Sequence, residues 1–175
     1  TGLTAMYGDT LAQVNITGAT NPEGNTAGTW SWVEPNKSVG DANSVTQNFR
    51  AKFTPSEEAA GFGIVTDIDV PVTVSAKTLT DVTIADIPAQ TYTGKAIEPA
   101  VTVTSATAGN DLVKGKDYTV KYSDNENVGP ATVTVNPVEN GNYTFTPVTK
   151  KFTITPKTAT ISITVVDKTY NGTAF

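Results

Sequence analysis

The chain repeats part of its own sequence. This repetition constrains the possible fold more than any other feature of the sequence does. Val72–Thr78 (VTVSAKT) returns 80 residues later as Phe152–Thr158 (FTITPKT). Thr91–Ile97 (TYTGKAI) returns 78 residues later as Thr169–Phe175 (TYNGTAF). Repetition at a nearly constant interval predicts similar structural units arranged in series along the chain.

The repeat also sets the boundaries that we predict for these units. Module one occupies residues 1–77 and module two residues 78–157, while residues 158–175 form the first strand of a truncated third module. The third segment is too short to enclose a core of its own. No Gly/Ser-rich linker separates modules one and two at residues 75–78, so we expect little bending there. The modules should therefore stand end to end as a rod.

Alternation of apolar and polar residues predicts antiparallel strands throughout the chain, each with one buried face. The alternating apolar positions are Val45, Phe49, Ala51 and Phe53; Ile68, Val70, Val72 and Val74; Val101 and Val103; Tyr118, Val120 and Tyr122; Ala131, Val133 and Val135; and Val148, Phe152 and Ile154. The 32 Thr and 20 Val residues also favour β structure. We expect an all-β fold of sandwich type, with at most one helical turn at residues 55–60.

Composition excludes several classes of function. The chain has no His and no Cys, which rules out a Ser–His–Asp triad, a thiol nucleophile and a zinc site with His or Cys ligands. Lys and Arg number 12 against 17 Asp and Glu, for a net charge of −5, and this balance opposes binding to nucleic acid. No apolar run is long enough to span a membrane. We expect no enzyme, no cofactor and no membrane insertion.

Several motifs carry a resemblance to a known family. They are Tyr92–Ile97 (YTGKAI), Leu112–Tyr122 (LVKGKDYTVKY) and Gly141–Thr144 (GNYT) in module two, and Tyr7–Leu11 (YGDTL) and Gly28–Trp32 (GTWSW) in module one. Module two closely resembles an immunoglobulin-like repeat found in tandem in large surface proteins of Gram-positive bacteria. Module one is similar to a sister repeat of the same proteins. The third segment resembles the start of a Tyr-Asp-Gly repeat, with Asn171 in place of Asp.

The resemblance implies tandem immunoglobulin-like β-sandwich modules arranged end to end. It implies a structural or adhesive role in the stalk of an extracellular, cell-wall-associated protein, with no enzymatic activity. The partners would be neighbouring repeats of the same chain, and host or cell-wall glycans or proteins. Because these motifs consist of turn and core residues, they carry almost no information about a ligand.

Trp30 and Trp32 are the candidate ligand-binding residues. They lie two positions apart on an expected strand, so both rings point to the same side. In the alternative function they form an aromatic platform that stacks a sugar ring, as in a carbohydrate-binding module. In the other interpretation they fill and cover the sandwich core, and large aromatic side chains on strands usually do so.

Acidic residues raise two further hypotheses. Asp124 and Glu126 are weak candidates for a Ca²⁺ site, but Asp and Asn also favour hairpin turns, and the spacing of an EF-hand loop is missing. Asp67 and Asp69 share one face of a strand. A hydrolase needs its carboxylates facing one another across a cleft, so we interpret this pair as a solvated stripe that discourages edge aggregation.

A Lys–Asn isopeptide crosslink is present in many immunoglobulin-like domains of Gram-positive bacteria, so its candidates must be considered. They are Lys77, Lys95, Lys150 and Lys151, with Asn140 and Asn142 as partners. These lysines lie beside turns or on polar faces rather than in a core. We therefore expect no crosslink.

The two ends of the chain suggest a contact between molecules. The strand that should precede Tyr7 is expected to be mostly missing, which leaves an open sheet edge in module one. The third segment supplies a strand of that type with no module to join. Because open edges and free strands pair through their main chains, we expect Ile161, Ile163 and Val165 to pack against module one of a neighbouring molecule.

Overall fold

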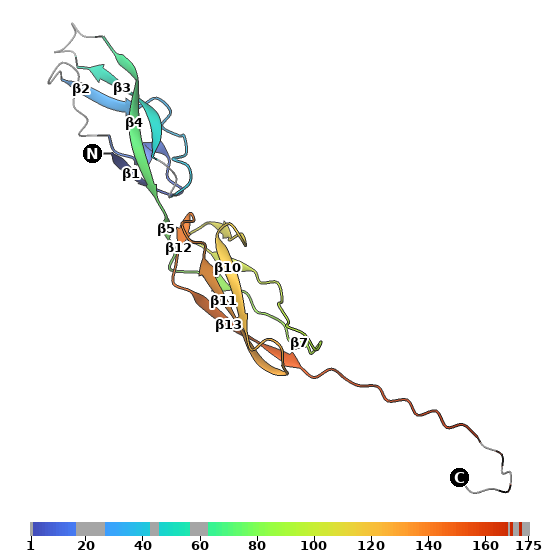
Figure 1. The fold of residues 1–175 in the computed structure, drawn as a ribbon. Helices are drawn as coiled ribbons and strands as arrows, with labels where there is room; N and C mark the ends of the chain where they lie inside the picture. The colour runs from blue at the N-terminus through green and yellow to red at the C-terminus, as the bar shows by residue number, and fades with distance from the viewer. Residues whose placement is uncertain are drawn as a thin grey trace.

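The computed structural model describes residues 2–16, 27–42, 46–56, 63–167, 169 and 172. Within these ranges the chain forms β strands and one short 3₁₀ helix, η1 (Leu11–Gln13), which confirms the all-β prediction. Figure 1 shows two groups of strands that follow one another along an elongated molecule. We call residues 2–76 the N-terminal half and residues 77–156 the C-terminal half. Residues 157–167, the tail, extend from the far end (Figure 1).

The N-terminal half contains one four-stranded sheet. Its strands are β1 (Leu3–Met6), β2 (Gly28–Trp32), β3 (Gln47–Pro55) and β4 (Val65–Ser75), in the order β1-β4-β3-β2. All pairs are antiparallel except β1 with β4. Along β3, Phe49, Ala51 and Phe53 are buried while Arg50 and Lys52 are exposed. The predicted alternation is thus confirmed for this strand, and Val45 lies outside the described residues.

The strand before Tyr7, which we expected to be mostly missing, is present over four residues as β1. Leu3–Met6 pair in parallel with Val72–Ser75, and the Tyr7 amide donates to the Ser75 carbonyl at 2.9 Å. This part of the β4 edge is therefore covered. Too few residues precede Tyr7 for an alternating pattern to reveal the strand.

The helix η1 was not predicted from the sequence. The Thr10 amide donates to the side-chain oxygen of Gln13 at 2.7 Å, the reciprocal contact of a capping box. The spacing of Thr10 and Gln13, three positions apart, could therefore have predicted this turn. The helical turn expected at residues 55–60 falls mostly on positions outside the described residues; Pro55 itself ends β3.

The C-terminal half contains two sheets and a short pair of strands. The first sheet has the order β10-β11-β13-β7, with β7 (Gln90–Thr91), β10 (Tyr118–Ser123), β11 (Gly129–Pro137) and β13 (Val148–Thr155). The second has the order β6-β8-β9, with β6 (Thr83–Ile84), β8 (Val103–Ser105) and β9 (Asn110–Asp111). The remaining pair is β5 (Lys77–Thr78) with β12 (Tyr143–Thr144), which run parallel. Ala131, Val133 and Val135 of β11 are fully buried, as their alternation predicts.

The buried apolar side chains fall into clusters that do not cross between the halves. One cluster is built from described residues of the N-terminal half, among them Leu11, Trp32 and Phe49. The other two draw only on described residues from Leu79 onward. Burial of apolar area, at about 25 cal/mol per Å², is thus gained separately in each half. In the part of the chain that the structure describes, no helix is long and apolar enough to cross a membrane.

Candidate functional site

Trp30 and Trp32 both face the core of the N-terminal half. Trp32 is 7% exposed, and its indole N–H donates to the Val14 carbonyl at 2.8 Å. Its ring meets Phe49 edge-on, with 6.4 Å between centroids, and Trp30 lies 5.3 Å from Phe53. Trp30 is half-buried, and both tryptophans line a surface hollow together with residues 12–16. Both rings contact the core, and Trp30 has the larger exposed part.

Asp124 and Glu126 lie in the hairpin loop between β10 and β11. Asp124 adopts a left-handed backbone conformation, with φ of 57°, and both side chains are exposed. Their neighbour Asn125 connects the loop to Ile97 through two hydrogen bonds of 2.9 and 3.1 Å. Among the described residues, no group of three or more acidic side chains is placed to hold a metal ion. The loop geometry matches the hairpin interpretation.

Asp67 and Asp69 lie beside Arg50 of the neighbouring strand. The Arg50 guanidinium is 3.1 Å from the Asp69 carboxylate and 3.7 Å from that of Asp67, and it also donates to the Asp67 carbonyl. All three side chains are more than half exposed. Asp67 has φ of 61°, next to an irregularity in the β3–β4 register. The pair thus forms a cross-strand ion-pair cluster at a bulge, a partner that sequence reasoning did not identify.

The candidate crosslinking residues have other contacts. Lys77 donates to the Thr107 carbonyl at 3.0 Å, and Lys150 forms an ion pair of 2.6 Å with Asp86. Lys95 and Lys151 are exposed. Asn142, a candidate partner for such a crosslink, is instead hydrogen-bonded through its side chain to Ala42 and Asp41, which lie 100 and 101 positions away in the other half of the molecule.

Asn142 joins the two halves through a pair of hydrogen bonds. Its side-chain N–H donates to the Asp41 carboxylate at 2.8 Å, and its side-chain oxygen accepts from the Ala42 amide at 2.8 Å. Asn142 is 8% exposed. Because a buried polar group without a partner is costly, this two-point contact holds the β11–β12 loop against residues 41–42. We call it the Asn142 clamp.

Two further features reinforce the clamp. The rings of Tyr7 and Tyr143 meet edge to face across the same boundary, with 5.2 Å between centroids and 88° between planes. Burial raises the pKa of Tyr143, and the nearby Tyr7 adds to the shift. Ala76 alone separates β4 from β5 and packs against the N-terminal core. We call the clamp, the tyrosine pair and this strand connection together the joint.

Only part of the joint could be predicted from the sequence. The short connection at residues 75–78 is visible in the sequence, and Tyr7 and the Gly-Asn-Tyr motif belong to the motifs that carry the resemblance. No periodicity or spacing linked Asn142 to Asp41, because their contact depends on how the two halves meet. Comparison of the chain with family models, with curated proteins and with solved structures found no match.

Proposed function

We propose that the chain is a stretch of tandem immunoglobulin-like β-sandwich modules that acts as a stiff spacer in the stalk of a bacterial cell-surface protein. The observation that carries the proposal is the joint. A two-point polar clamp, an aromatic contact and an almost uninterrupted strand all resist bending at one boundary. A spacer needs this property, whereas two independent binding domains would function equally well on a flexible linker.

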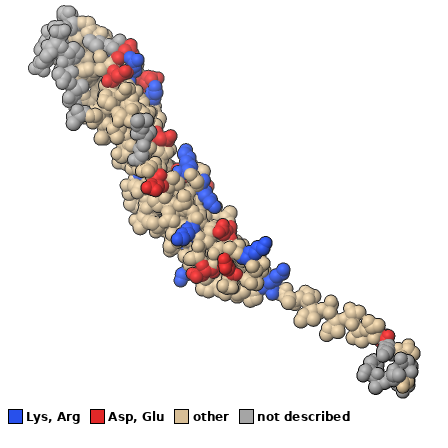
Figure 2. All heavy atoms as spheres, in the orientation of Figure 1, with Lys and Arg blue, Asp and Glu red and all other residues tan. Residues whose placement is uncertain are grey.

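Three other observations support the proposal. The separate hydrophobic clusters suit units that fold one by one, and the repeat interval suits units of one kind. The charged side chains are distributed along both halves instead of gathering at one site, on the face seen in Figure 2. The extracellular, cell-wall-associated location rests on the resemblance of the motifs alone.

We expect the substitution Asn142→Ala to loosen the joint. It would leave the Ala42 amide and the Asp41 carboxylate without this partner, at a cost of about 1–3 kcal/mol for a buried unsatisfied group. The measurement is a distance distribution between two labels, one in each half. The chain has no Cys, so cysteines introduced at the exposed Thr29 and Lys121 would be the only labelling sites.

The unsubstituted chain should give one narrow distance distribution, and Asn142→Ala a broader one. Glu139→Ala is the matched control, because Glu139 lies in the same loop but is exposed, and it should leave the distribution narrow. A broad distribution in the unsubstituted chain would refute the stiff spacer.

The alternative, a carbohydrate-binding module, is favoured by one feature: half-buried Trp30 borders a surface hollow. Fluorescence separates the two functions because Trp30 and Trp32 are the only tryptophans. We expect the Trp30→Phe variant, which reports on Trp32, to emit at short wavelength and resist a soluble quencher. The Trp32→Phe variant should be quenched more strongly. A change in the Trp30 emission on adding cell-wall polysaccharide would favour the binding module over the spacer.

A further inference from the structure

The strand β10 leaves one edge of its sheet open. It stands at the end of the order β10-β11-β13-β7, so only β11 pairs with it. β10 has six residues, whereas the strands at the other sheet edges of this half have two each. An open edge presents unpaired main-chain groups, to which an extended peptide can add as a new strand.

The ladder between β10 and β11 shows which main-chain groups face this edge. The Val138 amide donates to the Asp117 carbonyl at 3.2 Å, one residue before β10 begins. Hydrogen-bonded and non-hydrogen-bonded pairs alternate along an antiparallel ladder, so Lys121 directs its main-chain groups toward β11. Val120 and Tyr122 direct theirs away from β11, and no hydrogen bond within the described residues occupies these outward groups.

The loop before β10 closes the first part of the edge and leaves the rest free. The Gly115 amide donates to the Tyr118 carbonyl at 2.8 Å, and Lys114 forms a parallel bridge with Tyr118. Beyond this point Val120 and Tyr122 each offer one amide and one carbonyl. Their side chains are half-buried at the margin of the core. A strand added here would therefore gain main-chain hydrogen bonds and also cover apolar surface.

The charges around this edge define the strand that it fits. Lys121 is exposed in the middle of β10, and Lys114 and Lys116 are exposed in the loop before it. None of these three lysines forms an ion pair with a described residue. Asp124 and Glu126 lie past the other end of β10. An incoming strand should therefore place an acidic side chain opposite Lys121, since opposite charges facing each other across a strand pair are stabilising.

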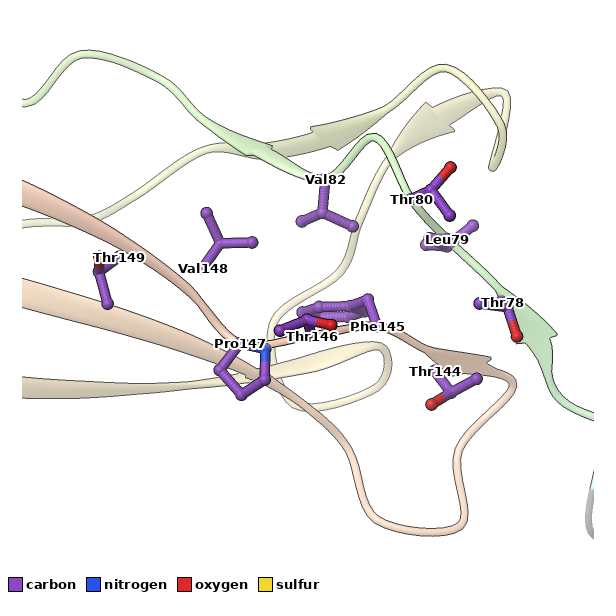
Figure 3. A pocket seen from close by; sticks show the side chains of 10 residues that line it. All are labelled: Thr78, Leu79, Thr80, Val82, Thr144, Phe145, Thr146, Pro147, Val148 and Thr149. Atoms are coloured by element: carbon purple, nitrogen blue, oxygen red, sulfur yellow. The ribbon is translucent and has the colours of Figure 1, made fainter.

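The other side of the same sheet is flanked by the chain itself. β7 pairs with Ile154 and Thr155 at the end of β13. Near the start of β13, Leu79 and Val82 line a hollow together with Phe145 (Figure 3). The lining of this hollow contains no charged side chain, so an acidic segment would find no counter-charge there.

We propose that the open edge of β10 docks an extended segment of a partner protein in which an acidic residue stands between two apolar ones. The acidic side chain lies opposite Lys121, and the apolar ones cover Val120 and Tyr122. Lys121 also keeps two copies of this chain apart. The two-fold register that pairs all the outward groups sets Lys121 against the same lysine of the second copy, and like charges directly opposite are destabilising. The site gives the spacer a lateral attachment point and does not depend on the stiffness of the joint.

A charge-swapped copy of the chain serves as the probe strand. The variant Lys121→Glu carries an acidic residue between Val120 and Tyr122, and Lys121 is exposed, so folding should not be affected. In sedimentation velocity, an equimolar mixture of this variant with the unsubstituted chain should form one-to-one dimers, while each chain alone stays monomeric. Added salt should dissociate the dimers, because it screens an exposed ion pair. Lys151→Glu is the matched control: Lys151 is exposed on β13, away from the edge, and its mixture should stay monomeric.

Amide hydrogen exchange then shows where the two chains meet. The Val120 and Tyr122 amides should exchange more slowly in the mixture than in either chain alone, because the added strand occupies them. A mixture of Lys121→Glu with the unsubstituted chain that stays monomeric would overturn the proposal, and so would equal association of Lys151→Glu. Dimers that leave these two amides unprotected would place the contact elsewhere. Self-association of the unsubstituted chain through these amides would show that the edge takes a second copy instead.

Discussion

Phe53→Ala is expected to lower the free energy of unfolding of the N-terminal half by about 3–5 kcal/mol, the cost of cutting a large buried aromatic to Ala. Phe53 is 0% exposed, lies in the middle of the sheet on β3 and stacks at a tilt against Trp30. The cavity left behind would be enclosed by a strand on either side, so the surroundings have little freedom to collapse into it.

The C-terminal half should keep its stability in this variant, because the two halves share no buried cluster. Urea unfolding can follow each half by itself. Both tryptophans report on the N-terminal half, while Tyr118, Tyr122 and Tyr143 belong to the C-terminal half. Lys52→Ala, on the exposed face of the same strand, is the control and should shift neither transition. An equal shift of both transitions would show that the halves unfold as one unit.

Much of the strand content could be predicted because one face of each strand is buried. Burial imposes a period of two on the sequence, and β11 follows it completely, with Ala131, Val133 and Val135 inward. Turn residues were equally readable: Asp124 occupies the left-handed position of the β10–β11 loop, a conformation that Asp and Asn tolerate.

The remaining features depend on contacts between distant segments, which local patterns do not encode. The parallel pairing of β1 with β4 joins residues almost 70 positions apart. The sequence pattern predicts only that Arg50 is an exposed residue of β3. The bulge in β4 then places two carboxylates beside it. The Asn142 clamp could not be predicted either, because it depends on how the two halves are oriented.

Gly28→Ala is expected to destabilise the N-terminal half by about 1–3 kcal/mol through overpacking. Gly28 is the first residue of β2 and pairs with Pro55, the last residue of β3. A Cβ atom there would lie 2.5 Å from both the Phe53 ring and the Thr54 carbonyl oxygen, and 2.9 Å from the Pro55 Cα. Two of these three atoms belong to the backbone of a paired strand, so the sheet itself must shift. Urea unfolding monitored by tryptophan fluorescence gives the change directly.

Gly63→Ala is the matched control, because an added Cβ there meets nothing within 4 Å and its backbone is not left-handed. Its effect should stay within about 0.5 kcal/mol. Measured against Phe53→Leu alone, Gly28→Ala should still destabilise, though less than in the unsubstituted chain, since shortening the ring removes one close contact and leaves the two with the backbone. No destabilisation in that background would mean that the ring alone excludes a side chain at this position, and an unchanged transition in Gly28→Ala would mean that β2 can move away from β3 without cost.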